Sequence, residues 1–138
     1  MKTPDQFADL SRHYDGIMRE ADYDRWVVVV TLLADLVPSA RVRHIDLACG
    51  TGRLLKRLVQ HGWSSVGIDL SHGMLRQSRR GPYVPAVAAA DLAALPFVGR
   101  FNYATCVFDS VNFLLEDERL HAAFRSVADA LTDAGVFY

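Results

Sequence analysis

Apolar residues along this chain follow two different spacings. Short apolar runs predict buried strands at residues 42–47, 64–70, 84–92, 103–108 and 136–138. Between these runs, apolar positions recur at helical spacing after the turn at residues 49–52 and over residues 71–79 and 117–131. Two further helices are expected upstream, over residues 4–16 and 22–37. Alternating strands and helices predict an α/β fold, a doubly wound parallel sheet with right-handed crossovers.

Two of these helices carry a clear apolar stripe. The stripe of the last helix, which should face the sheet, consists of Leu120, Phe124, Val127 and Leu131. The stripe of the helix at 22–37 consists of Tyr23, Trp26, Val27, Val30, Ala34 and Val37. With 138 residues, the chain is expected to form one domain, with an N-terminal helical cap (1–38) and a core (39–138).

The turn at residues 49–52, Cys-Gly-Thr-Gly, joins the first strand to a helix. Glycine allows the backbone to approach a bound molecule closely, and a helix N-terminus presents unpaired N–H groups. A dinucleotide-binding turn would carry a third glycine at Leu55, and a phosphate-binding loop would end in Gly-Lys-Ser/Thr. Asp46 precedes the turn, where a carboxylate suits a positively charged ligand. These features favour a cationic ligand over a pyrophosphate.

The sequence Asp-Leu-Ala-Cys-Gly-Thr-Gly at residues 46–52 resembles the first motif of class I S-adenosylmethionine-dependent methyltransferases. The resemblance implies a Rossmann-like sheet of strand order 3-2-1-4-5, which a sixth strand and an antiparallel seventh would complete. Neither of these two strands is present, so the chain is expected to be a fragment truncated after the fifth strand. The open edge of that strand could support self-association.

An acidic residue ends the second strand. Asp69 lies 19 positions beyond Gly50, the spacing at which such a residue reaches a ribose diol. Its two acceptor oxygens match two vicinal hydroxyl donors. Folds that bind NAD share this feature, and the alternative role for Asp69 is to cap the following helix.

The resemblance implies further site residues. Tyr14 would lie over the cofactor, and Met74 would pack on the adenine ring, although a surface tyrosine and a core methionine are the ordinary alternatives. Asp109 is the candidate catalytic residue, unless it caps a helix. The remaining implied cofactor contacts are Ala48, Cys49, Gly50, Gly52, Leu70, Asp91, Leu92 and Phe108.

The composition limits the classes of partner that the protein is expected to bind. The 15 basic and 16 acidic residues leave no excess charge for nucleic acid or an anionic membrane. Cys49 and Cys106 lie in different elements, and no C-x-x-C or H-E-x-x-H motif predicts a metal. Two lone cysteines favour a reduced, cytoplasmic protein.

The sequence thus predicts a methyltransferase that uses S-adenosyl-L-methionine and a small-molecule N or O acceptor. The run Phe-Asp-Ser-x-Asn-Phe-Leu at residues 108–114 resembles a subgroup that acts on small amines or sugars. An NAD(P)-binding oxidoreductase and a non-catalytic nucleoside-binding or interaction module remain alternatives. No histidine is expected to act as a base, and His44 is expected to lie away from the site.

Overall fold

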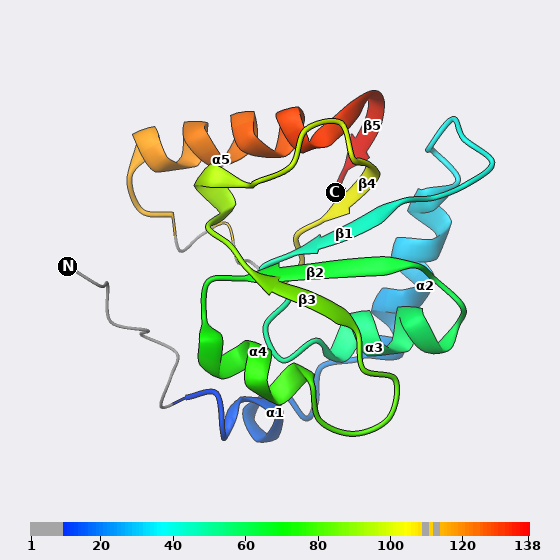
Figure 1. Cartoon of the computed structure of the whole chain (residues 1–138). Helices are drawn as coiled ribbons and strands as arrows, with labels where there is room; N and C mark the ends of the chain where they lie inside the picture. Colours follow the sequence, from blue (N-terminus) through cyan, green and yellow to red (C-terminus); the bar gives the residue numbers. More distant parts are fainter. Residues whose placement is uncertain (1–9, 109–110, 112–113) are drawn as a thin grey trace.

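A computed structural model describes residues 10–108, 111 and 114–138 and contains a five-stranded sheet (Figure 1). The strand order is β3-β2-β1-β4-β5, and each neighbouring pair runs parallel, which confirms the predicted Rossmann-like topology. The strands are β1 His44–Leu47, β2 Ser65–Asp69, β3 Ala86–Ala89, β4 Phe101–Thr105 and β5 Leu131–Phe137. The helices are α1 Tyr14–Ile17, α2 Tyr23–Ala34, α3 Arg53–Gln60, α4 His72–Ser78 and α5 Asp117–Ala130, with a 3-10 turn, η1, at Leu92–Ala94.

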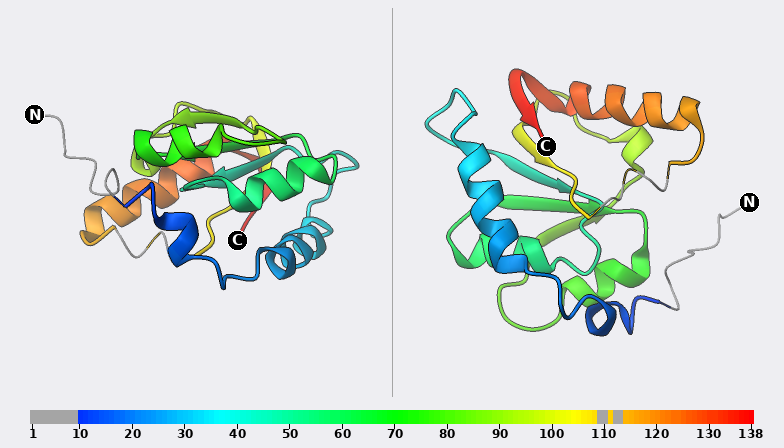
Figure 2. Two further views of the ribbon diagram at one scale, coloured as in Figure 1. Left: turned by 90° about the horizontal axis from the view of Figure 1, so that it is seen from below. Right: turned by 180° about the vertical axis from the view of Figure 1, so that it is seen from behind.

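Helices α2 and α3 pack on one face of the sheet. Their apolar side chains form a core with two residues from β4 and the segment that follows it, Tyr103 and Val107. The Tyr103 hydroxyl donates to the Val30 carbonyl at 2.9 Å, which ties β4 to α2. Helix α2 lies behind the sheet in Figure 1 and in front of it in the reverse view (Figure 2, right). The apolar stripe predicted over residues 22–37 is confirmed: five of its residues are buried and Trp26 is half-buried. The helix itself ends at Ala34, so the buried Val37 lies just beyond it.

The opposite face of the sheet is covered by α5 and η1. Its core combines strand residues such as Ile45, Ile68 and Ala104 with Val127 of α5. The stripe predicted for α5 was wrong in part, because Ala123 and Ala130 are buried while Phe124 is 48% exposed. Small alanine side chains let the helix approach the sheet.

The last two strands differ from their predicted bounds. β4 ends at Thr105 rather than at 108, and the positive φ of 61° at Phe108 does not fit a strand. β5 begins at Leu131, directly after α5, rather than at 136. Gly135 lies inside β5, where a Cβ would come within 2.9 Å of the Leu131 Cβ. Only glycine fits this tight irregularity in the strand.

The N-terminal helix is shorter than predicted. α1 covers four residues, Tyr14–Ile17, and Gly16 lies within it rather than ending it. Residues 4–9 of the predicted helix lie outside the described part of the chain. In the part that is described, no helix is both long and apolar enough to cross a bilayer.

Candidate cofactor-binding site

The chain reverses direction between β1 and α3 through a run of left-handed backbone. Ala48, Gly50 and Gly52 have φ values of 53°, 57° and 71°. Glycine adopts this conformation at no steric cost, whereas alanine does so with strain. The Cys49 N–H donates to the Ile68 carbonyl at 2.8 Å, which ties the turn to β2. The turn lies at the carboxyl end of β1, the side on which ligands bind in open α/β sheets.

Two glycines are required by close packing around this turn. A Cβ on Gly52 would lie 3.1 Å from the Ser78 Cβ, so Gly52 lets α4 approach the turn. A Cβ on Gly67 of β2 would lie 2.6 Å from the Leu55 side chain and 2.8 Å from the Cys49 sulfur. This role of Gly67 could not be expected from the sequence, because only the packing of α3 against β2 reveals it.

Asp46 accepts a hydrogen bond deep in the sheet. It is 2% exposed, and its Oδ1 accepts from the Thr105 hydroxyl at 2.7 Å. Thr105 Oγ1 also lies 2.9 Å from His44 Nε2, and His44 Nδ1 lies 2.9 Å from Ser65 Oγ. Because the only hydroxyl proton of Thr105 goes to Asp46, Thr105 must accept from an Nε2–H of His44. His44 Nδ1 then accepts from the Ser65 hydroxyl, and the chain of hydrogen bonds has one direction.

The same burial shifts two pKa values in opposite senses. Burial raises the pKa of Asp46 to about 7; the Thr105 hydrogen bond opposes this shift, and the nearby charge of Asp69 adds to it. Burial lowers the pKa of His44 to about 3, so the imidazole is neutral at pH 7. His44 supports the Asp46 carboxyl group through Thr105, a role that could not be expected from the sequence.

Asp69 links the glycine turn to α4. Its Oδ2 accepts from the Gly50 N–H at 2.8 Å, and its Oδ1 accepts from the Ser71 N–H at 2.8 Å. The N-cap of α4 is Ser71, whose hydroxyl oxygen accepts from the Met74 N–H at 3.2 Å. Each carboxylate oxygen can accept more than one hydrogen bond, so these contacts are compatible with a hydroxylated ligand.

A small cavity of about 30 Å³ lies at the carboxyl end of β1. Its volume suits a single water, whereas pockets for small molecules measure roughly 300–1,000 Å³. Among the described residues, six predicted cofactor residues line it, together with five others. The predicted residues are Tyr14, Asp46, Ala48, Cys49, Gly50 and Phe108, and the others are Tyr23, Thr51, Arg53, Leu54 and Val107. A ligand larger than water therefore requires the covering side chains to move.

Aromatic side chains cover this cavity. The Phe108 ring packs against Tyr23 at 5.1 Å and Trp26 at 5.4 Å between ring centroids. Tyr14 is half-buried, and burial with the nearby Asp69 raises the pKa of its phenol. Helix α1, which carries Tyr14, is held to the glycine turn by the Thr51 hydroxyl, which donates to Asp15 at 2.6 Å.

The other predicted residues lie outside the cavity. Leu70 is 63% exposed, whereas Met74 is buried on the inner side of α4. Asp91 caps η1 by accepting from the Ala93 N–H at 2.9 Å, and Leu92 begins that turn. The Arg119 guanidinium contacts both Asp91 oxygens at 3.0 Å. Partial burial acts to raise the pKa of Asp91, but these two donors outweigh it and lower that pKa. Asp109 lies outside the described residues.

The sheet is doubly wound, a glycine turn follows β1, and an acidic residue lies near the end of both β1 and β2. Together these features define a Rossmann-like nucleoside-binding domain. A family profile described as a methyltransferase domain matches residues 45–135, and the chain belongs to this family.

Individual relatives agree with this assignment. One relative is a protein of Geobacillus sp. (strain WCH70) whose name gives methyltransferase but no acceptor. It is 30% identical over 128 residues, and the match covers 89% of this chain and 52% of the Geobacillus protein. The dTDP-3-amino-3,4,6-trideoxy-alpha-D-glucopyranose N,N-dimethyltransferase of Streptomyces venezuelae is 31% identical, covering 75% of this chain and 45% of its own. A solved S-adenosylmethionine-dependent methyltransferase from Clostridium acetobutylicum superposes with a TM-score of 0.78 at 28% identity, covering 95% and 55% of the two chains.

The chain spans about half the length of the curated relatives it matches. Family and structural relatives together support S-adenosylmethionine as the cofactor.

Proposed function

We propose that this protein transfers a methyl group from S-adenosylmethionine to a nitrogen or oxygen atom of a small molecule. The observation that carries the proposal is the buried Asp46 carboxyl group beside the glycine turn, in a chain of the methyltransferase-domain family. An amino-sugar nitrogen is the acceptor we favour, because a relative at 31% identity is named as an aminosugar N,N-dimethyltransferase.

The residues at this site fit S-adenosylmethionine in their charge and in the shape of the glycine turn. Asp46 would face the cationic end of the cofactor, since a partly charged carboxylate in a low-dielectric wall attracts a positive group strongly. Asp69 would accept from the ribose hydroxyls, and Ala48, Cys49, Gly50 and Gly52 would shape the backbone around the ligand. Leu70, Met74, Asp91 and Leu92 would lie toward the adenine, where Asp91 would have to share its oxygens with Arg119.

When bound, the cofactor supplies a methyl group on a positively charged sulfur, which leaves as a neutral thioether when the acceptor's lone pair takes the methyl. This chain's residues would mainly orient the acceptor and exclude water. Tyr14, Tyr23 and Phe108 cover the cavity and suit that role. An amine acceptor needs only to be unprotonated, so a strong base is not required, and Asp109 remains the proposed catalytic residue.

Three further features are part of the proposal. A cytoplasmic location agrees with the two free cysteines.

The β5 edge, which borders the sheet, could pair with a second copy of the chain. Residues 1–38 would act as a cap over the core at 39–138, since Tyr14 and Tyr23 both reach the cavity.

Ligand binding separates this function from its alternatives. S-adenosylhomocysteine should raise the melting temperature of the protein, whereas NAD and NADP should not, because only a bound ligand stabilises the fold. A labelled-methyl assay over a panel of amino sugars and simple amines then tests transfer. Stabilisation by NAD alone would favour an oxidoreductase, and cofactor binding without transfer to any acceptor would favour a binding module.

A further inference from the structure

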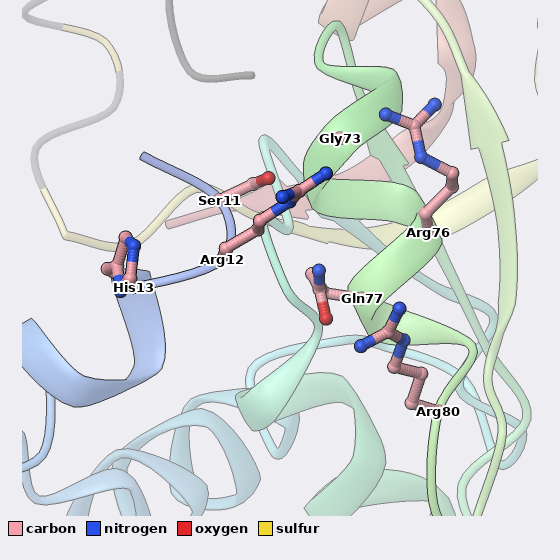
Figure 3. A pocket seen from close by; sticks show the side chains of 7 residues that line it. All are labelled: Ser11, Arg12, His13, Gly73, Arg76, Gln77 and Arg80. Atoms are coloured by element: carbon pink, nitrogen blue, oxygen red, sulfur yellow. The ribbon is translucent and has the colours of Figure 1, made fainter. Parts of the chain in front are cut away.

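A second and larger cavity lies between the N-terminal segment and α4. It measures about 400 Å³ and is lined by Ser11, Arg12, His13, Gly73, Arg76, Gln77 and Arg80. In Figure 3, Arg12 reaches from the N-terminal segment toward α4, and Gln77 and Arg80 lie on the α4 side of the same gap. The volume falls within the range of small-molecule pockets. None of these residues belongs to the predicted cofactor site.

The lining of this cavity is strongly basic. Of the seven described residues that line it, three are arginines and none carries a carboxylate. Among the described residues, the ion pairs are Arg57–Asp24 and Arg119–Asp91, so none involves these three arginines. Cations at the C-terminal end of α4 favour the helix dipole, which accounts for Arg76 and Arg80 in part. Arg12 belongs to a different segment, so that effect does not explain its place in the lining.

The chain as a whole is nearly neutral, with a formal net charge of −1. The positive charge in this cavity is therefore local and does not reflect a generally basic surface. Guanidinium groups present several N–H donors in a plane that matches phosphate oxygens, and such charge-assisted hydrogen bonds are strong. We propose that Arg12, Arg76 and Arg80 bind a small molecule that carries a phosphate or diphosphate group.

Two elements, the N-terminal segment and α4, connect this cavity to the candidate cofactor site. Tyr14, the residue that follows His13, lines the small cavity at β1. Ser78 of α4 packs against Gly52 of the glycine turn. A ligand that holds residues 11–13 against α4 would also fix the position of Tyr14. We therefore expect the phosphate ligand and the cofactor to strengthen each other's binding by the same factor, because coupling between two sites is reciprocal.

Isothermal titration with pyrophosphate, without cofactor, tests the site independently of the methyltransferase proposal. Pyrophosphate should bind the wild-type protein at low salt, and the double variant Arg76→Gln/Arg80→Gln should bind it about tenfold or more weakly. The control is Arg79→Gln, which removes an exposed arginine beside Arg80 that does not line the cavity. It should bind pyrophosphate within about twofold of wild type.

The nature of the ligand follows from parallel titrations. Inorganic phosphate, pyrophosphate and a nucleoside diphosphate should bind in increasing order of affinity, because the cavity is larger than a single phosphate. Undetectable pyrophosphate binding at low salt, or equal loss in the Arg79→Gln control, would overturn the proposal. Tighter binding of a short RNA than of any small phosphate would also overturn it, in favour of a nucleic-acid surface. Circular dichroism checks that each variant is folded.

Discussion

The Thr105 hydroxyl donates a hydrogen bond of 2.7 Å to the Asp46 carboxyl group, across neighbouring strands β4 and β1. The same hydroxyl oxygen accepts from His44 Nε2 at 2.9 Å. Thr105 is fully buried and therefore transmits the support of His44 to Asp46 without competition from water. Asp46 is thus held toward the cavity by its neighbours in the sheet.

Replacing this hydroxyl should cost stability and change the titration of Asp46. In Thr105→Val, His44 Nε2–H and Asp46 each lose their partner in a buried environment, which should lower the free energy of unfolding by about 1–3 kcal/mol. Loss of the bond should also raise the pKa of Asp46 further, because the bond lowers it. Urea unfolding measures the first effect. Thr132→Val, at a half-buried position of β5, is the control and should change stability much less.

The raised pKa of Asp46 gives stability a defined pH dependence. The carboxyl group has an ordinary pKa of 3.8 and a folded-state pKa of about 7. The folded state therefore binds more protons than the unfolded state between these values, and Asp46's contribution to stability falls as pH rises through that window. His44, with its pKa lowered to about 3, acts in the opposite sense and loses its contribution as pH falls below 6.5.

Comparison with Asp46→Asn isolates the contribution of Asp46 to the pH dependence of stability. The unfolding free energy of wild type minus that of the variant should fall by up to about 1.4 kcal/mol per pH unit from pH 4 to pH 7. Above pH 7 the difference should be level. Urea unfolding at several pH values measures it. A difference that rises with pH would show that Asp46 is stabilised in its charged form instead.

The close packing at Gly67 predicts a large cost for a single methyl group. In Gly67→Ala the new Cβ would overlap Leu55 and Cys49, which should lower the free energy of unfolding by about 1–3 kcal/mol. Gly16→Ala is the matched control, since a Cβ there meets no atom within 4 Å and alanine favours the helix. Equal unfolding midpoints for the two variants would contradict the packing account.

The tether between Asp15 and Thr51 should matter for ligand binding more than for folding. Asp15→Ala removes the acceptor of the 2.6 Å hydrogen bond that holds α1 at the glycine turn. The Kd for S-adenosylhomocysteine should rise by about 3- to 10-fold, because Tyr14 is then less well positioned. Asp24→Ala removes another exposed carboxylate, paired with Arg57, and should leave this Kd unchanged. An equal effect of both variants would show that α1 has no special role.

The five strands and their parallel direction could be expected from the sequence, because apolar runs alternated with helical stripes. The strand order followed only from the resemblance to the methyltransferase family. The irregularity in β5 could not be expected, since it depends on how Gly135 fits over Leu131. The glycine turn and the two acids were evident from their spacing alone.

The support of Asp46 was missed because it depends on strand register. Asp46 pairs with Thr105, and His44 pairs with Ser65, only once β1 is placed between β2 and β4. The sequence did offer one signal, since the apolar runs that form β1, β2 and β4 each contain a polar residue. Tyr23 was missed as a lining residue because only the docking of α2 brings it to the cavity. Arg53, the first residue of α3, was missed because its position next to the cavity follows from the glycine turn that precedes it.

Isothermal titration of S-adenosylmethionine at pH 8 tests the central claim most directly. Asp46 should then be mostly charged, and the wild-type protein should bind the cofactor, while Asp46→Asn should bind it at least about tenfold more weakly. Equal affinity of the folded variant and wild type, or no binding by either protein, would contradict the assignment of Asp46 to a cationic cofactor.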